Sequence, residues 1–167
     1  MDRHFEIRKL VYTALLTAII EAAKWALNAI ANVELVSLLT MVFTIYFGWQ
    51  ITLCSLLLFA LIECLWWGVS IWTVTYFYVW PLLILVTWLF RDKMDRYTAA
   101  LISGFFGLAF GALCSLTTLV MSGPEAAFAW WIAGIPYDVV HGISNCIIAF
   151  ILYEPLIRAL KRMNIRL

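Results

Sequence analysis

Long apolar segments alternate with short polar breaks along the whole chain, and this pattern predicts membrane-spanning helices. A helix needs roughly 20 apolar residues to cross a hydrocarbon core of about 30 Å, so the chain has room for about six crossings. We expect them at Leu10–Ile30, Leu35–Phe47, Ile51–Trp67, Thr75–Phe90, Tyr97–Val120 and Pro136–Leu160. The second segment is short for a full span. The pattern predicts an all-α integral membrane protein with one six-helix transmembrane domain over residues 1–167.

The breaks between these segments contain turn-forming or charged residues. They are Asn32-Val33-Glu34, Gly48-Trp49-Gln50, Gly68-Val69-Ser70, the charged loop Arg91–Arg96, and a loop with Gly123-Pro124-Glu125. Because Pro81 has no N–H, we expect it to kink the fourth helix or to restart it. The polar start Met1–Lys9 leads into an apolar stretch without a small-residue cleavage site, which predicts a retained helix rather than a signal peptide.

Composition narrows the possible function classes. Apolar residues make up 65% of the 167 and charged residues only 13%, too few to cover a water-soluble protein. A net charge of +1 argues against nucleic acid as a partner. Cys54, Cys64, Cys114 and Cys146 lie in apolar segments without CxxC spacing, so we expect neither a disulfide framework nor a metal site. No nucleophile with a base and no phosphate-binding glycine loop is recognisable, so we expect no enzyme activity and no cofactor.

The basic residues predict an orientation. Cytoplasmic flanks of membrane helices carry an excess of Lys and Arg. With six crossings, ten of the eleven basic residues fall on one side: Arg3, Arg8, Lys9, Arg91, Lys93, Arg96, Arg158, Lys161, Arg162 and Arg166. The loops of the other side carry none. We therefore expect both ends of the chain on the cytoplasmic side.

Two features of the first helix have competing interpretations. Ala14, Ala18, Ala22 and Ala26 recur every four residues and form a smooth strip, suited either to the protein's own helices or to a partner membrane protein. Glu21 and Lys24 are three residues apart, where they either neutralise each other or face a polar interior reached by a solute or a partner.

The outer half of the predicted bundle combines aromatic rings with buried polar groups. The rings surround two outer loops: Trp66, Trp67, Trp72, Tyr76, Tyr78 and Trp80, then Trp130, Trp131 and Tyr137. An interfacial aromatic belt explains part of this enrichment, and a pocket for a flat organic solute would explain its asymmetry. Asp138, His141 and Asn145 share one helix face, and Glu63 lies near the same level; these groups favour ligand contact or gating, with interhelical hydrogen bonding as the alternative.

In this setting the chain resembles the substrate-binding S components of energy-coupling factor (ECF) vitamin transporters over nearly its whole length. The resemblance rests on the alanine strip together with three outer segments. These are Ala31-Asn32-Val33-Glu34-Leu35-Val36-Ser37, Ile71-Trp72-Thr73 with Tyr78-Val79-Trp80-Pro81, and Gly134-Ile135-Pro136-Tyr137-Asp138-Val139-Val140-His141-Gly142-Ile143-Ser144-Asn145.

The resemblance implies a six-helix subunit of the bacterial cytoplasmic membrane that captures a vitamin-like solute from outside. It implies docking on a transmembrane coupling protein, driven by two ATPases, through Ala14, Ala18 and Ala22. The implied solute site is Asn32, Glu34, Trp72, Tyr76, Trp80, Asp138, His141 and Asn145, to which the aromatic and acidic pattern adds Glu63, Trp67 and Trp131. The tryptophan content favours a large or planar solute, with a corrinoid such as cobalamin or its precursor slightly ahead of a deazapurine or a pyridine-type compound.

Two other protein classes share some of these features. A tryptophan-rich porphyrin-binding sensor would explain the aromatic content but has five crossings, which would place the two ends on opposite faces. A membrane scaffold protein of cell-wall elongation has a similar length and several crossings, but needs no outer pocket. The position of the two ends and the presence of a pocket separate these alternatives.

Overall fold

A computed structural model describes residues 3–163, and their side chains from residue 6 onward. Over this range the chain forms helices and short connections, without a β-strand. The helices are α1 (Arg3–Leu27), α2 (Val36–Phe47), α3 (Trp49–Trp67), α4 (Ile71–Leu89), the 3-10 turn η1 (Arg91–Lys93), α5 (Arg96–Ser122) and α6 (Pro124–Arg162). All of the α-helices except α2 are long and apolar enough to cross a membrane. The prediction of an all-α, multi-pass membrane protein is confirmed.

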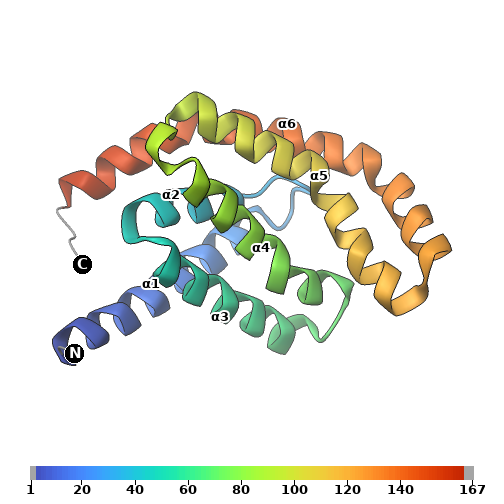
Figure 1. The fold of residues 1–167 in the computed structure, drawn as a ribbon, viewed down its shortest axis with the longest axis horizontal. Helices are drawn as coiled ribbons and strands as arrows, with labels where there is room; N and C mark the ends of the chain where they lie inside the picture. The colour runs from blue at the N-terminus through green and yellow to red at the C-terminus, as the bar shows by residue number, and fades with distance from the viewer. Residues whose placement is uncertain (1–2, 164–167) are drawn as a thin grey trace.

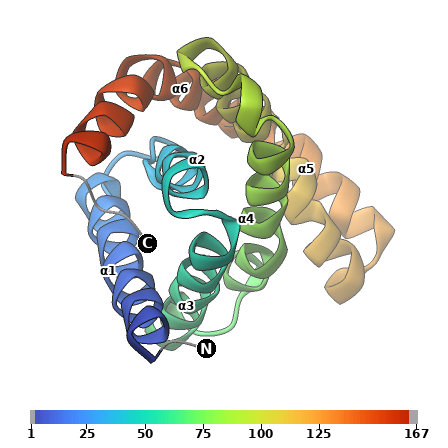
Figure 2. The same cartoon turned by 60° about the vertical axis from the view of Figure 1, so that its left-hand side comes forward.

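The short helix α2 occupies the centre of the bundle. It contacts α1, α3, α4, α5 and α6, and Figure 2 shows it enclosed by the longer helices. Ten of its twelve residues are buried. The hydroxyl groups of Thr40 and Thr44 are buried with it and donate to carbonyl oxygens one turn earlier, each at 2.7 Å. At about 1.5 Å per residue, α2 covers only part of a bilayer core.

The start of α6 differs from the sequence prediction, and Pro81 does not restart the fourth helix. α6 begins at Pro124 and not near Pro136, so the expected long loop before it is wrong. Gly123, with φ of 86°, makes the turn in the left-handed region that favours glycine, and Pro124 suits the first helical position because that position needs no N–H. α4 runs through Pro81 without restarting, so the proline removes one hydrogen bond but does not end the helix.

Among the described helices, α5 and α6 make the most extensive contact, and they form a hairpin (Figure 1). Their backbones approach closely because glycines lie at the contact. A Cβ atom added at Gly107 would lie 2.8 Å from the Cα atom of Gly142, and one added at Gly111 would overlap the carboxylate of Asp138. The predicted small-residue pair Gly107 and Gly111 therefore lies at a helix–helix contact.

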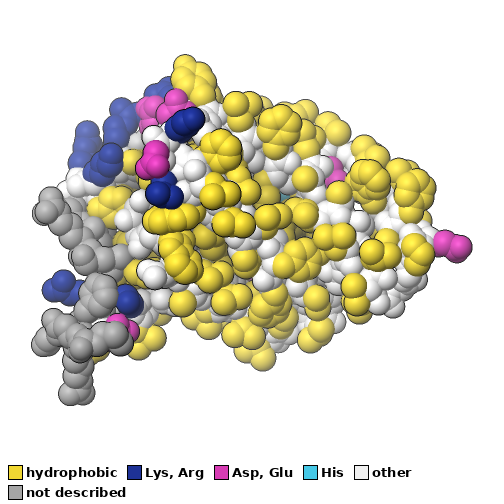
Figure 3. Space-filling view, in the orientation of Figure 1, with side chains coloured by type: hydrophobic (Ala, Val, Ile, Leu, Met, Phe, Trp, Pro, Cys, Tyr) yellow, Lys and Arg dark blue, Asp and Glu magenta, His cyan; other side chains and the backbone are white. Residues whose placement is uncertain are grey.

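Charged residues are segregated along the long axis of the molecule. Both ends of the described chain lie at one end of the bundle, and Figure 3 shows Lys and Arg side chains gathered there. Arg96 and Glu154 join the start of α5 to the last part of α6 at this end, with Arg96 Nε donating to Glu154 Oε1 at 2.9 Å. The predicted basic residue Arg166 and the side chain of Arg3 lie outside the described part of the chain.

Candidate functional site

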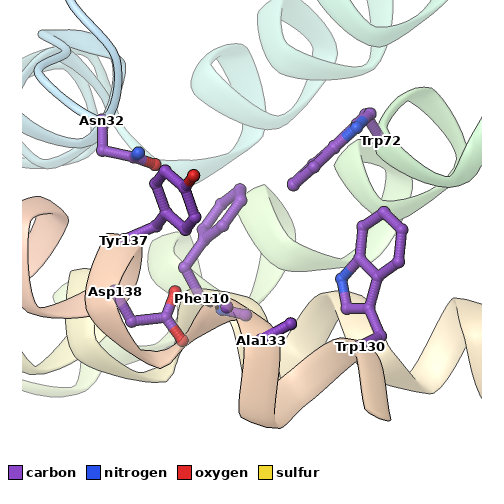
Figure 4. A pocket seen from close by; sticks show the side chains of 9 residues that line it. Asn32, Trp72, Phe110, Trp130, Ala133, Tyr137 and Asp138 are labelled. Carbon is purple, nitrogen blue, oxygen red and sulfur yellow. Dashed lines mark hydrogen bonds between the residues drawn. The ribbon is translucent and has the colours of Figure 1, made fainter.

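Two adjoining cavities lie in the half of the bundle away from the basic residues. The large cavity, of about 390 Å³, lies between α4, α5, α6 and the connection after α1, and is lined by Asn32, Trp72, Phe110, Gly111, Trp130, Ala133, Gly134, Tyr137 and Asp138. Trp72 and Trp130 lie together at one end of it, with ring centroids 5.4 Å apart (Figure 4). The small cavity, of about 170 Å³, shares Asn32, Trp72 and Phe110 and adds Lys24, Glu34, Val36, Phe59, Tyr76, Trp80 and His141.

The connection between α1 and α2 forms part of the cavity wall. Asn32 has a φ of 58°, and its carbonyl oxygen accepts a hydrogen bond from Ser144 of α6 at 2.8 Å. Glu34 follows and accepts from the backbone N–H of Ser37 at 2.8 Å, at the start of α2. A carboxylate there is stabilised by the unpaired N–H groups and the positive end of the helix dipole.

Glu34 also joins this connection to α6. Its Oε1 atom accepts from Asn145 Nδ2 at 2.8 Å and lies 3.3 Å from His141 Nε2. Because a carboxylate oxygen can only accept, His141 donates through Nε2, and in a neutral ring Nδ1 is then an acceptor. That atom is buried and has no partner among the described residues. The connection and α6 therefore meet through one shared carboxylate.

Asp138 contacts α5, whereas His141 and Asn145 of α6 contact Glu34. Its Oδ1 atom accepts the backbone N–H of Gly111 at 2.9 Å, and its carboxylate packs against α5 where Gly111 leaves room. It also borders the large cavity. The interhelical hydrogen bond, one of the two interpretations from the sequence, is present, and ligand contact or gating by this lining carboxylate stays a prediction.

Lys24 of α1 pairs with Glu63 of α3. Its ammonium group hydrogen-bonds to Glu63 Oε2. The Nζ atom lies 5.9 Å from the ring centroids of Phe59 and Trp67 and 5.7 Å from that of Tyr76, within cation–π range. Of the two residues considered together in the sequence, Lys24 makes its ion pair with Glu63 on α3 and not with Glu21. Glu21 Oε1 is buried without a hydrogen-bond partner among the described residues.

Aromatic rings link this ion pair to the Glu34 group. The Tyr76 and Trp80 centroids are 5.7 Å apart, those of Trp80 and Phe110 6.0 Å, and those of Phe110 and His141 4.9 Å. Every member of this row lines the small cavity. The cavity therefore has Lys24 at one end of an aromatic row and the His141–Glu34 pair at the other.

Most of the predicted ligand-binding residues border the cavities. These are Asn32, Glu34, Trp72, Tyr76, Trp80, Asp138 and His141. The remaining four do not line either one. Glu63 is held by Lys24, Trp67 stacks on Trp25 with centroids 5.8 Å apart, Trp131 contacts Phe128, and Asn145 supports Glu34 from behind.

Several lining residues were missed by sequence reasoning. Phe59 and Phe110 look like ordinary apolar helix residues, and nothing in their local sequence marks them. Trp130 and Tyr137 belong to the predicted outer aromatic group but were not selected from it. Lys24 could have been found, since an ionisable residue in an apolar helix indicates a polar contact.

The alanine strip of α1 faces outward. Ala14, Ala18 and Ala22 are exposed, as is Ala26, while Leu16, Thr17 and Ile20 are buried on the opposite face. On the buried face Thr17 donates to the carbonyl of Ser55 at 3.0 Å and Ser55 donates to that of Thr13 at 3.2 Å, which joins α1 to α3. The strip is therefore not used in packing within this chain.

In comparisons with known proteins, the chain matches no protein-family model, no curated protein and no solved structure.

Proposed function

We propose that the chain is the substrate-binding S component of an ECF-type vitamin transporter in a bacterial cytoplasmic membrane. The observation that carries the proposal is the pair of adjoining aromatic cavities in the half of the bundle away from the basic residues. If the basic end faces the cytoplasm, the cavities lie toward the outside, where a capture subunit needs them. The protein itself binds the solute, and a coupling protein with two ATPases supplies the energy.

Six crossings require that α2 completes a span that it is too short to make alone. The connection Asn28–Leu35 supplies the missing length. Irregular backbone at membrane depth is tolerated where it is buried in protein or lines a cavity, and Asn32 and Glu34 line one here. With α2 as the second crossing the number of crossings is even, which would put both ends on one side, and the basic flanks favour the cytoplasmic side.

The exposed strip of α1 supports docking on a coupling protein. Small side chains allow a partner helix to approach closely, which is how helices associate in lipid. The protein's own helices leave Ala14, Ala18 and Ala22 free for such a contact.

Transport measurements on a docking variant test this proposal. Ala18→Trp places a large ring on the strip and should abolish ATP-driven uptake while solute binding by the purified protein is retained. Ala159→Trp makes the same change at an exposed position of α6 away from both cavities and should leave uptake and binding unchanged. Normal uptake by the Ala18→Trp protein would refute the docking surface.

Within residues 3–163, five helices are long and apolar enough to span the membrane, and this number favours a second candidate, the five-crossing tryptophan-rich porphyrin sensor. Reporter tags on both ends distinguish the two. If both ends lie on the same face of the membrane, the transporter subunit is supported. If they lie on opposite faces, the transporter proposal is wrong and the sensor is favoured.

The cavity volumes bear on the kind of solute. The volume of about 390 Å³ lies near the lower end of the range of ligand sites, and the volume of about 170 Å³ lies below that range. They favour a small flat solute over the corrinoid that the tryptophan content first suggested. Mass spectrometry of the solute that copurifies with the protein identifies it.

A further inference from the structure

We propose that the solute is a flat aromatic molecule with an anionic or strongly accepting group at one end and an N–H donor at the other. This inference rests on the proposed function, because it specifies the solute of the same site. It follows from the two ends of the small cavity, which differ in charge and hydrogen-bonding character.

The Lys24 end can bind an acceptor. A lysine ammonium has three N–H donors, and Glu63 takes one of them. The Lys24 side chain is 23% exposed, whereas that of Glu63 is only 2% exposed, so the ammonium and not its partner borders the cavity. A carboxylate or carbonyl oxygen of a solute can accept from the remaining donors.

The Glu34 end can bind a donor. An ionised carboxylate offers about four acceptor positions, and the backbone and side chain of Ser37, together with His141 and Asn145, occupy them. The Glu34 side chain is 18% exposed and borders the same cavity. The acceptor left for a solute N–H at this end is the Nδ1 atom of His141, which has no partner among the described residues and accepts when the ring is neutral and donates to Glu34 through Nε2.

The wall between these two ends selects a flat molecule. Tyr76, Trp80 and Phe110 follow one another from the Lys24 end to His141, so a solute that reaches both ends lies along their rings. Stacking and edge contacts with aromatic rings stabilise a planar solute in this position. Trp80 Nε1 is buried without a partner among the described residues.

Calorimetric titration with three matched probes tests the inference on the purified full chain. The first probe is an aminonaphthalene carboxylate with its amino and carboxylate groups at opposite ends of the rings. The other two are the aminonaphthalene and the naphthalene carboxylate, each with one group removed. We expect the two-ended probe to bind at least about tenfold more tightly than either one-ended probe, since each end adds a hydrogen bond.

A paired substitution assigns the acceptor end. Lys24→Met with Glu63→Gln removes one positive and one negative charge together, and should weaken binding of both carboxylate probes about tenfold while leaving the aminonaphthalene unchanged. Arg91→Gln with Asp92→Asn makes the same change in an exposed ion pair of η1 and should alter none of the three affinities. Unchanged binding of all three probes by the Lys24 variant, or equal loss of all three, would overturn the proposal.

Chemical labelling of the unmodified protein gives a second measurement that needs no variant. The two-ended probe should protect Lys24 from reductive methylation, read by peptide mass spectrometry, and should leave the exposed Lys161 equally reactive. Absence of protection at saturating probe would contradict the assigned orientation. A copurifying solute that lacks either end would overturn this inference and leave the capture function standing, whereas the docking experiment on Ala18 tests that function separately.

Discussion

Lys24 and Glu63, from helices α1 and α3, form an ion pair inside an apolar bundle, and three aromatic rings surround the ammonium. Two charges removed from water depend on each other, because either one alone would be buried without compensation. The pair therefore fixes the position of α1 against α3, and it places a cation at the cavity wall.

Breaking this pair from one side should destabilise the protein strongly. Glu63→Leu leaves the ammonium unpaired and should cost about 3 to 5 kcal/mol in the free energy of unfolding. Unfolding by denaturing detergent, followed by circular dichroism, measures the loss. Adding Lys24→Met to Glu63→Leu removes both charges and should recover most of the stability. If the double variant were as unstable as the single one, packing and not charge would explain the loss.

The closeness of α5 and α6 depends on glycine. Gly107→Ala puts a methyl group 2.8 Å from the backbone of Gly142 and should destabilise the protein by about 1 to 3 kcal/mol, since the helices must separate. Gly134→Ala, in the same hairpin, meets no atom within 4 Å and should be neutral or slightly stabilising because alanine favours helix. Thermal unfolding of both variants gives the comparison. Equal midpoints would show that the contact tolerates a methyl group.

Asn145 holds the connection between α1 and α2 through Glu34 and Ser37. Asn145→Leu removes both hydrogen bonds and leaves Glu34 with fewer donors, at a cost of about 1 to 3 kcal/mol. Hydrogen exchange of the segment 28–35 should become faster, which mass spectrometry detects on peptides. Ser115→Ala, which removes a hydrogen bond within one turn of α5, serves as the control and should leave this segment unchanged.

The start of α5 should respond to acid through Asp95. The backbone N–H of Thr98 donates to its carboxylate at 2.8 Å, and this hydrogen bond lowers the pKa of Asp95 below the ordinary 3.8. Because the pKa of Asp95 is lower in the folded protein than in the unfolded chain, the cap stabilises the protein fully at a pH above the pKa of the unfolded chain. It is lost as the pH falls through the lower folded value.

Hydrogen exchange at the first turn of α5 measures this effect. In the unmodified protein exchange should accelerate, beyond its intrinsic dependence on pH, only below about pH 4. Asp95→Asn keeps a capping side chain that does not titrate and should remove that acceleration. Asp95→Ala should give fast exchange at every pH. A measured pKa of Asp95 above its ordinary value would contradict the capping role.

The sequence predicts the elements better than the site, for physical reasons. Apolar length and basic flanks identify α2 to α5 within a few residues, because each crossing must satisfy its own backbone and the breaks carry turn residues. The first helix starts earlier than predicted, at Arg3 and not Leu10, because its first turns are polar. The start of α6 was wrong because Gly123 and Pro124 look like a loop, although they form a tight turn followed directly by a helix. Local residue type does not distinguish these two outcomes.

In the candidate site, too, the sequence marks some residues, whereas others are recognised only from the packing of the helices. Polar residues in apolar helices attract notice in the sequence, so Glu34, Asp138 and His141 could be selected without a structure. Phe110 could not be, because its place beside His141 depends on how α5 packs against α6. The partner of Lys24 lies 39 residues away on another helix, and spacing within one helix pointed to Glu21 instead.

The contact between Trp72 and Trp130 gives the protein a spectroscopic signal that depends on the distance between two helices. Their indole rings belong to α4 and α6, which are separated by the whole of α5 in the chain, yet their centroids are 5.4 Å apart at one end of the large cavity. Excited states of two indoles at that separation couple, and the coupling falls steeply as the rings move apart. The difference between the near-ultraviolet circular dichroism of the unlabelled protein and that of a Trp130→Phe variant therefore reports how far α4 and α6 stand from each other, because the indole pairs that Trp25 makes with Trp66 and Trp67 are present in both proteins.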